Sequence, residues 1–270
     1  MTTLKVPASP GALITDIPLG TGGLRYVGFS AHRLAENETL ALASGDDELC
    51  VVILAGKASA QAGGAGGDMQ WAAVGERASV FEEKSPHAFY LPAHSTLALT
   101  GLEAAEIAVA RAPGGPRALP TRLIDPASMK RSVRGSGSNT RYVCDILPET
   151  EPANSLLVVE VITPPGNSSS YPPHKHDSNA IPRESQLEET YYHRLNPPQG
   201  FAFQRVYTDE RDLDETLCVE DHDVVKVPRG YHPVVVPHGY TSYYLNVMAG
   251  PVRAWHFHND PRHEWMLRKG

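Results

Sequence analysis

Residues 223–236 have the sequence DVVKVPRGYHPVVV, and this stretch is the most informative about the fold. A short Val-rich run is followed by Pro-x-Gly and then by a second Val-rich run, an order typical of a strand, a turn and another strand. Residues 86–100, PHAFYLPAHSTLALT, repeat the order of strand, proline turn and strand in the first half of the chain. The sequence therefore predicts two copies of one β module.

Strand-like runs rich in Val, Ile, Tyr and Leu recur along the whole chain and are bounded by Pro and Gly. Gly and Pro number 23 each in 270 residues, about 17% of the chain against a usual share of about 12%. No stretch keeps a helical hydrophobic period over more than about three turns. We therefore expect an all-β protein, with strands at residues 49–54, 88–91, 156–162, 187–192, 201–207, 224–227 and 243–248.

Residues 111–120, RAPGGPRALP, form the most linker-like stretch of the chain. Three prolines and two glycines leave little backbone for a strand or a helix to use. We expect a boundary there, between an N-terminal module of residues 1–120 and a C-terminal module of residues 121–270.

The charge balance argues against one class of function. With 24 Lys and Arg against 31 Asp and Glu, the formal net charge is −7, which disfavours nucleic-acid binding through a positive field. The N-terminus lacks the basic start and apolar core of a signal peptide. The longest apolar run, residues 50–55, is far shorter than the roughly 20 residues of a membrane helix. We therefore expect no nucleic-acid or membrane partner.

The three cysteines indicate the compartment. Cys50, Cys144 and Cys218 are too few and too scattered for a disulfide framework or a Cys-x-x-Cys metal site. A reducing compartment is the default expectation for such a chain. We expect a cytoplasmic protein that binds a small molecule. The sequence leaves open whether the protein forms a homo-oligomer.

Histidines and one glutamate form the pattern most suggestive of chemistry. His174 and His176 make a His-x-His pair, and residues i and i+2 of a strand point to the same face. Glu189 lies in the next strand-like run, so a neighbouring strand can supply a carboxylate. The Pro-x-Gly turn of residues 223–236 places His232 at the start of the following strand. These three imidazoles and one carboxylate are expected to hold a divalent metal.

The ligand types narrow the choice of metal. Imidazole suits zinc, iron, nickel and copper, while a carboxylate keeps manganese and iron in play. Four protein ligands can complete a tetrahedral zinc site, whereas a six-coordinate metal keeps two positions open for adjacent substrate oxygens. We expect Zn²⁺, with Mn²⁺, Fe²⁺ and Ni²⁺ as alternatives. A second His-x-His, His256 and His258, lacks such partners and is expected to line the mouth of the site or to be structural, with metal binding as its alternative.

The order of these residues resembles the two motifs of the cupin superfamily, and two such modules in one chain resemble a bicupin. The spacing from His176 to Glu189 is longer than in the usual motif, and His222 stands where a glycine usually opens the second motif. With these departures the chain is similar to the 5-deoxy-glucuronate isomerases of myo-inositol catabolism. The similarity spans nearly the whole chain and rests on residues 171–177, 187–194, 200–207, 227–234, 243–250 and 259–261.

The resemblance implies a bicupin fold, two jelly-roll-like β-barrels, with a metal held by His174, His176, Glu189 and His232. It also implies aldose–ketose isomerisation of 5-deoxy-D-glucuronate to 5-dehydro-2-deoxy-D-gluconate. The first half has no His-x-His before Glu48, so the N-terminal module is expected to be structural and to hold no metal.

The implied reaction needs a group that moves a proton between adjacent carbons, with a pKa near neutrality. Four residues near the expected metal are candidates, and the sequence does not choose among them. They are Glu189, Tyr191, His193 and Tyr207.

A uronate substrate also needs a donor for its carboxylate, which the planar guanidinium of arginine binds best. Alternation from residue 201 onward predicts that Arg205 shares the face of Glu189. Lys175 and Arg183 are further candidates, although their pattern places them nearer to solvent.

Two other classes of function stay open at this point. A cupin oxygenase can hold Fe²⁺ with the same ligands, and a bicupin can bind a sugar without catalysis. The block from His193 to Arg205 favours the isomerase, because it resembles that family and a metal site alone does not require it.

Overall fold

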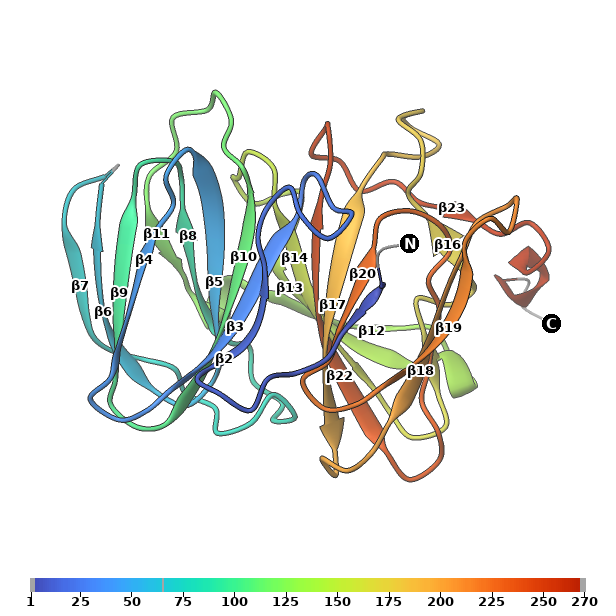
Figure 1. The fold of residues 1–270 in the computed structure, drawn as a ribbon, viewed down its shortest axis with the longest axis horizontal. Helices are drawn as coiled ribbons and strands as arrows, with labels where there is room; N and C mark the ends of the chain where they lie inside the picture. Colours follow the sequence, from blue (N-terminus) through green and yellow to red (C-terminus); the bar gives the residue numbers. More distant parts are fainter. Residues whose placement is uncertain (1–2, 65, 268–270) are drawn as a thin grey trace.

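The computed structural model describes residues 3–64 and 66–267. Its regular secondary structure is almost entirely β-strand, which confirms the predicted all-β class. Two β modules lie side by side, one coloured blue to green and the other yellow to red (Figure 1). The predicted strands are confirmed: residues 49–54 lie within β5 (Asp47–Ala55) and residues 187–192 begin β17 (Glu188–Asn196).

The first module contains two facing antiparallel sheets. The six-stranded sheet has the order β11 (Arg122–Ile124), β8 (His87–Leu91), β5, β10 (Ala105–Pro113), β3 (Gly28–Leu34) and β2 (Leu13–Ile17). The four-stranded sheet has the order β4 (Thr39–Ala43), β9 (Thr96–Gly101), β6 (Ala58–Gly63) and β7 (Met69–Val74).

The second module is built in the same way. Its seven-stranded sheet has the order β1 (Lys5–Val6), β20 (Val224–Val227), β17, β22 (Thr241–Ala249), β14 (Leu157–Thr163), β13 (Arg141–Leu147) and β12 (Lys130–Arg134). Its four-stranded sheet has the order β15 (Ser168–Ser169), β21 (Val234–Val235), β18 (Ala202–Tyr207) and β19 (Asp214–Val219), and β16 (His174–Lys175) pairs with β23 (His258–Asn259). Three short 3-10 helices are η1 (Pro126–Ser128), η2 (Gly137–Asn139) and η3 (Glu264–Leu267).

Two strands pair across residue 120. β1 comes from the N-terminus and joins the sheet of the second module beside β20, while β11 follows residue 120 and joins β8 of the first (Figure 1). The division into residues 1–120 and 121–270 stays a prediction. None of the helices in the described part of the chain is long and apolar enough to span a membrane.

Alternation along each strand sorts the side chains between different cores. In β5, Leu49, Val51 and Ile53 face the interior of the first module, which is packed with aliphatic and aromatic side chains. The residues between them, such as Cys50 and Val52, face the second module. Both faces of β5 are therefore buried, which explains its nearly continuous apolar sequence.

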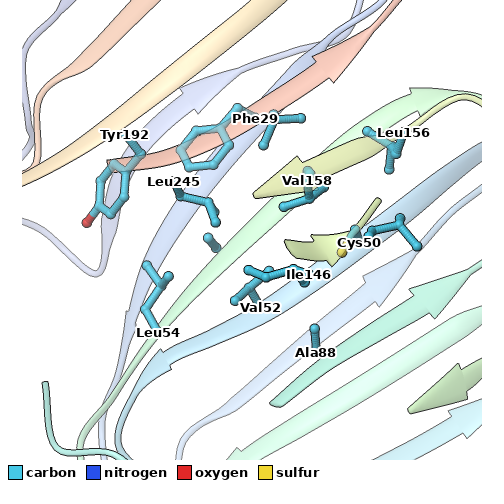
Figure 2. Close-up of a cluster of buried hydrophobic side chains, with 14 of the residues drawn as sticks. Phe29, Cys50, Val52, Leu54, Ala88, Ile146, Leu156, Val158, Tyr192 and Leu245 are labelled. Atoms are coloured by element: carbon cyan, nitrogen blue, oxygen red, sulfur yellow. The ribbon is translucent and has the colours of Figure 1, made fainter. Parts of the chain in front are cut away.

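The core between the modules joins strands from both halves of the chain. Figure 2 shows Phe29 and Val52 from the first module packed with Val158, Tyr192 and Leu245 from the second. These residues are at most 2% exposed. Burial of these apolar side chains stabilises the contact between the two modules.

Buried polar contacts also cross between the modules. Arg77 donates two hydrogen bonds to Glu160, at 2.9 and 2.8 Å, and the Tyr243 hydroxyl donates to the same carboxylate. Glu48, which is fully buried, accepts the backbone N–H groups of residues 154–156 and the hydroxyl of Tyr90. Each buried carboxylate is thus hydrogen-bonded, as burial of a charge requires.

Candidate metal centre

Three histidines converge inside the second module. His174 lies in β16, His176 follows directly, and His232 follows the Pro-x-Gly turn after β20. Their ligand atoms all lie within 4.8 Å of one another. Lys175, between the first two, points away from them, as alternation requires.

Glu189 in β17 completes this cluster. Its Oε1 lies 3.4 Å from Nε2 of His176 and 3.5 Å from Nε2 of His232. All three side chains are 1–2% exposed. Within the described residues, these three atoms are buried and have no hydrogen-bond partner.

Three unpaired buried polar atoms that face one another are costly unless something binds them. A divalent cation fits, since each atom offers it a lone pair. The electrostatics agree with this fit. Burial lowers the pKa of His174 and of His176, so both imidazoles are neutral, the form that binds metals. Burial alone raises the pKa of Glu189, but the neighbouring His232 and His176 bring it below its usual range.

A second set of contacts orients the cluster. Nδ1 of His176 lies 3.1 Å from the carbonyl oxygen of His256, and Nδ1 of His232 lies 2.9 Å from that of Gly230. These bonds put the proton on Nδ1 and leave Nε2 free as a ligand. Asn246 donates to Oε2 of Glu189 at 2.8 Å and so turns Oε1 toward the histidines. His256 thus contributes its backbone, and its ring is not part of the described cluster.

The face of β17 that carries Glu189 also carries Tyr191 and His193. The Tyr191 hydroxyl lies 3.3 Å from Ser170 Oγ, and burial, followed by the charge of Glu189, raises its pKa well above the usual range. Nε2 of His193 lies 2.9 Å from the side-chain oxygen of Gln204. Burial lowers the pKa of His193 to about 4, so this ring is neutral at pH 7.

A cavity of about 60 Å³ opens beside the cluster. His174, Glu189 and Tyr191 line it, whereas His193 does not. The other polar and aromatic lining residues are Arg134, Arg141, Ser170, Tyr244, Asn246 and Trp255.

The structure does not bring Arg205 and Tyr207 to the cluster. In β18, Gln204 and Val206 face the interior of the module. Arg205 therefore faces outward, whereas the sequence predicted that it shares the inward face with Glu189. Arg205 instead donates two hydrogen bonds of 2.7 Å to Asp214. Tyr207 donates to Asp260 at 3.0 Å and also lies outside the cavity. Alternation shows which residues share a face, but it does not show which face points inward.

The other two basic candidates also lie away from the cavity. Lys175 contacts Asp209 and lies 3.8 Å from Asp177. Arg183 is exposed in the loop before β17. The sequence missed Arg141, Tyr244 and Asn246, because strand alternation alone does not distinguish them from ordinary strand residues.

The comparisons with known proteins all indicate the same family. Residues 4–266 match the model of the KduI/IolB family. The chain is 51% identical over 261 residues to the 5-deoxy-glucuronate isomerase of Geobacillus kaustophilus (strain HTA426), covering 97% of this chain and 92% of that protein. It is 47% identical over 258 residues to the protein of the same name from Bacillus subtilis (strain 168), covering 95% and 93%.

Solved structures give the same picture of the fold. The crystal structure of an IolB-like protein from Salmonella typhimurium LT2 has a TM-score of 0.94 and 46% identity, covering 98% of this chain and 100% of that one. Oxalate decarboxylase from Lactobacillus farciminis has a TM-score of 0.65 at 13% identity, covering 96% and 89%. At that identity the likeness concerns the fold alone.

Proposed function

The chain belongs to the KduI/IolB family, and from this premise we propose that it isomerises 5-deoxy-D-glucuronate to 5-dehydro-2-deoxy-D-gluconate at a divalent metal centre. The proposed ligands are His174, His176, Glu189 and His232. The observation that supports this centre most strongly is the convergence of three buried atoms, Nε2 of His176, Nε2 of His232 and Oε1 of Glu189, none of which has a hydrogen-bond partner among the residues that the structure describes. The substrate follows from the name shared by relatives about half identical over nearly the full chain.

We propose Zn²⁺ as the metal, because neutral imidazoles dominate the ligand set. When bound, it supplies Lewis-acid stabilisation of the negative charge that develops on the substrate's oxygens. The protein holds the ligands rigid through His256, Gly230 and Asn246.

The chain's own part in the chemistry is proton transfer. An aldose becomes a ketose when a proton leaves C2 and returns at C1 through an enediolate, which needs a positioned acid or base. Of the four groups the sequence singles out, Tyr191 and Glu189 line the cavity. The raised pKa of Tyr191 keeps its phenol protonated, so it can donate to the substrate oxygen on which charge develops.

The direct test is anaerobic incubation of the metal-loaded protein with 5-deoxy-D-glucuronate in D₂O. We expect NMR to show loss of the aldehyde and formation of the ketose, with deuterium in the product, and a chelator to stop turnover. Metal content is measured on the same sample. An oxygenase would instead consume O₂ and stay inactive without it. A metal-loaded protein that leaves the uronate unchanged would overturn the proposed function.

Replacing Tyr191 with Phe is expected to lower kcat by about 100-fold or more, since one positioned donor to an oxygen that gains charge contributes about 10²–10³-fold. KM should stay close to wild type, because the ring keeps its packing against Tyr244 and His232. The hydroxyl also contacts Glu189, so metal is supplied at saturation and metal content is checked beside kcat. Steady-state kinetics and metal analysis measure both. Tyr240→Phe is the matched control, since Tyr240 packs on Phe201 away from the cavity lining. A wild-type kcat in Tyr191→Phe would exclude this role.

A further inference from the structure

Two arginines face the interior of the second module at the edge of its large sheet. Arg134 of β12 and Arg141 of β13 are directly opposite each other in the antiparallel pair. Arg141 shares its face of β13 with Val143, which is part of the module's inner core. Both arginines line the cavity that also contains His174 and Glu189.

Like charges placed directly opposite each other on a sheet destabilise it, so the surroundings of each arginine matter. Arg134 is compensated by Asp145 at 3.2 Å and lies over the ring of Trp255. Arg141 donates only to the backbone and side-chain oxygens of Asn139, both through Nη1 at 3.0 Å. No carboxylate pairs with Arg141 within the described residues.

The half-buried guanidinium of Arg141 is therefore a positive charge that has no counter-ion in the described part of the chain. Burial, together with the like charge of Arg134, lowers the pKa of Arg141. An anion in the cavity would relieve this cost. Gly135 leaves room for this guanidinium, since a Cβ there would lie 2.7 Å from Nη1 of Arg141.

We propose that Arg141 binds the carboxylate of the substrate, with Arg134 as a secondary positive charge. This inference rests on the proposed function and adds to it the group that selects a sugar acid over a neutral sugar. Two of the proposed ligands, His174 and Glu189, line the same cavity as Arg141, so one uronate can meet the metal at its aldehyde end and Arg141 at its carboxylate end. A planar guanidinium suits a carboxylate better than the point charge of a lysine does.

Entry of a uronate requires the cavity to widen, because about 60 Å³ holds only about two water molecules. Trp255, which is partly exposed, lines the cavity from the chain segment that follows β22. Its displacement would uncover Arg134, over which it packs.

The test uses a pair of ligands that cannot isomerise. Reduction of 5-deoxy-D-glucuronate at its aldehyde gives an acid that keeps the carboxylate, and the carboxamide of that acid is its neutral counterpart. Calorimetric Kd values for both are measured on metal-loaded wild type, Arg141→Gln and Arg131→Gln, together with kcat/KM for the substrate. Arg131 is the matched control, because it lies on β12, the strand next to that of Arg141, and is not among the residues that line this cavity.

In Arg141→Gln we expect the Kd of the acid to rise about thirtyfold, the value of one charge-assisted hydrogen bond. The Kd of the carboxamide should change less than about threefold, and metal content should match wild type. Arg131→Gln should bind both ligands as wild type does. An unchanged Kd for the acid, or equal rises for the two ligands, would overturn the assignment.

If Arg141→Gln does not fold, Arg141→Lys takes its place. A selective rise in the Kd of the acid is still expected, because lysine lacks the planar pair of donors that a guanidinium offers to a carboxylate. Wild-type Kd values in that variant would then overturn the inference. Binding of the ligand pair does not depend on turnover, so loss of the isomerase hypothesis and loss of the Arg141 assignment are read separately.

Discussion

Alanine in place of His176, His232, His174 or Glu189 is expected to abolish metal binding and activity together. The four ligands bind the metal together. Loss of a residue that only hydrogen-bonds to a metal ligand already lowers metal affinity about 10–100-fold. Loss of a ligand itself should exceed that range. The buried position of the cluster adds to the effect, since the remaining polar atoms lie in a site that water reaches poorly.

Metal content after dialysis against a defined free metal concentration, measured beside kcat, checks this expectation. His94→Ala is the control, because His94 lies in the first module and its side chain is 76% exposed. It should retain the metal and the activity of wild type. Wild-type metal content in three or more of the four ligand variants would remove the proposed site.

The largest expected loss of stability follows replacement of Arg77 with Met. The variant leaves Glu160 buried, with a side chain only 7% exposed, and without its positive partner. Removing one partner of a buried ion pair costs about 3–5 kcal/mol. Arg77 also donates to the carbonyl oxygen of Leu54, so the backbone of β5 loses a partner as well.

Urea unfolding measures the change in the free energy of unfolding. Arg205→Met is the matched control, since its ion pair with Asp214 has the same two-bond geometry but side chains 42% and 32% exposed. An exposed pair is worth about 1 kcal/mol or less. A double variant that replaces both Arg77 and Glu160 with Met should recover part of the loss. Equal losses in Arg77→Met and Arg205→Met would show that the buried pair does not hold the modules together.

Local sequence was enough to predict seven of the strands, whereas others, such as β3, β10 and β13, were not predicted. The run at residues 224–227 forms β20 with the predicted bounds, and residues 243–248 lie within β22. Strand formation here follows from side-chain type and from the placement of Pro and Gly, both of which are local properties. The His-x-His pair and the Pro-x-Gly turn are local in the same sense, which is why the three histidines could be named before their distances were known.

Local sequence was not enough to predict which face of β18 points inward. The sequence shows that Phe203, Gln204 and Arg205 alternate between two faces. Which of them points inward depends on how β18 pairs with β19 and β21. A shift of one residue exchanges the two faces of a strand. Arg205 was therefore expected inside, and the structure places Gln204 there instead.

The β-rich fold class and the residue types that can bind a metal follow from the amino-acid sequence alone. That Arg141, 33 positions before His174 in the chain, lines the same cavity as that ligand is visible only in the folded chain. Periodicity reports on neighbours along one strand, whereas a site is assembled from strands that meet through sheet pairing and core packing. Those contacts depend on the whole chain, so the charge that faces the proposed metal site could not be identified from any local pattern.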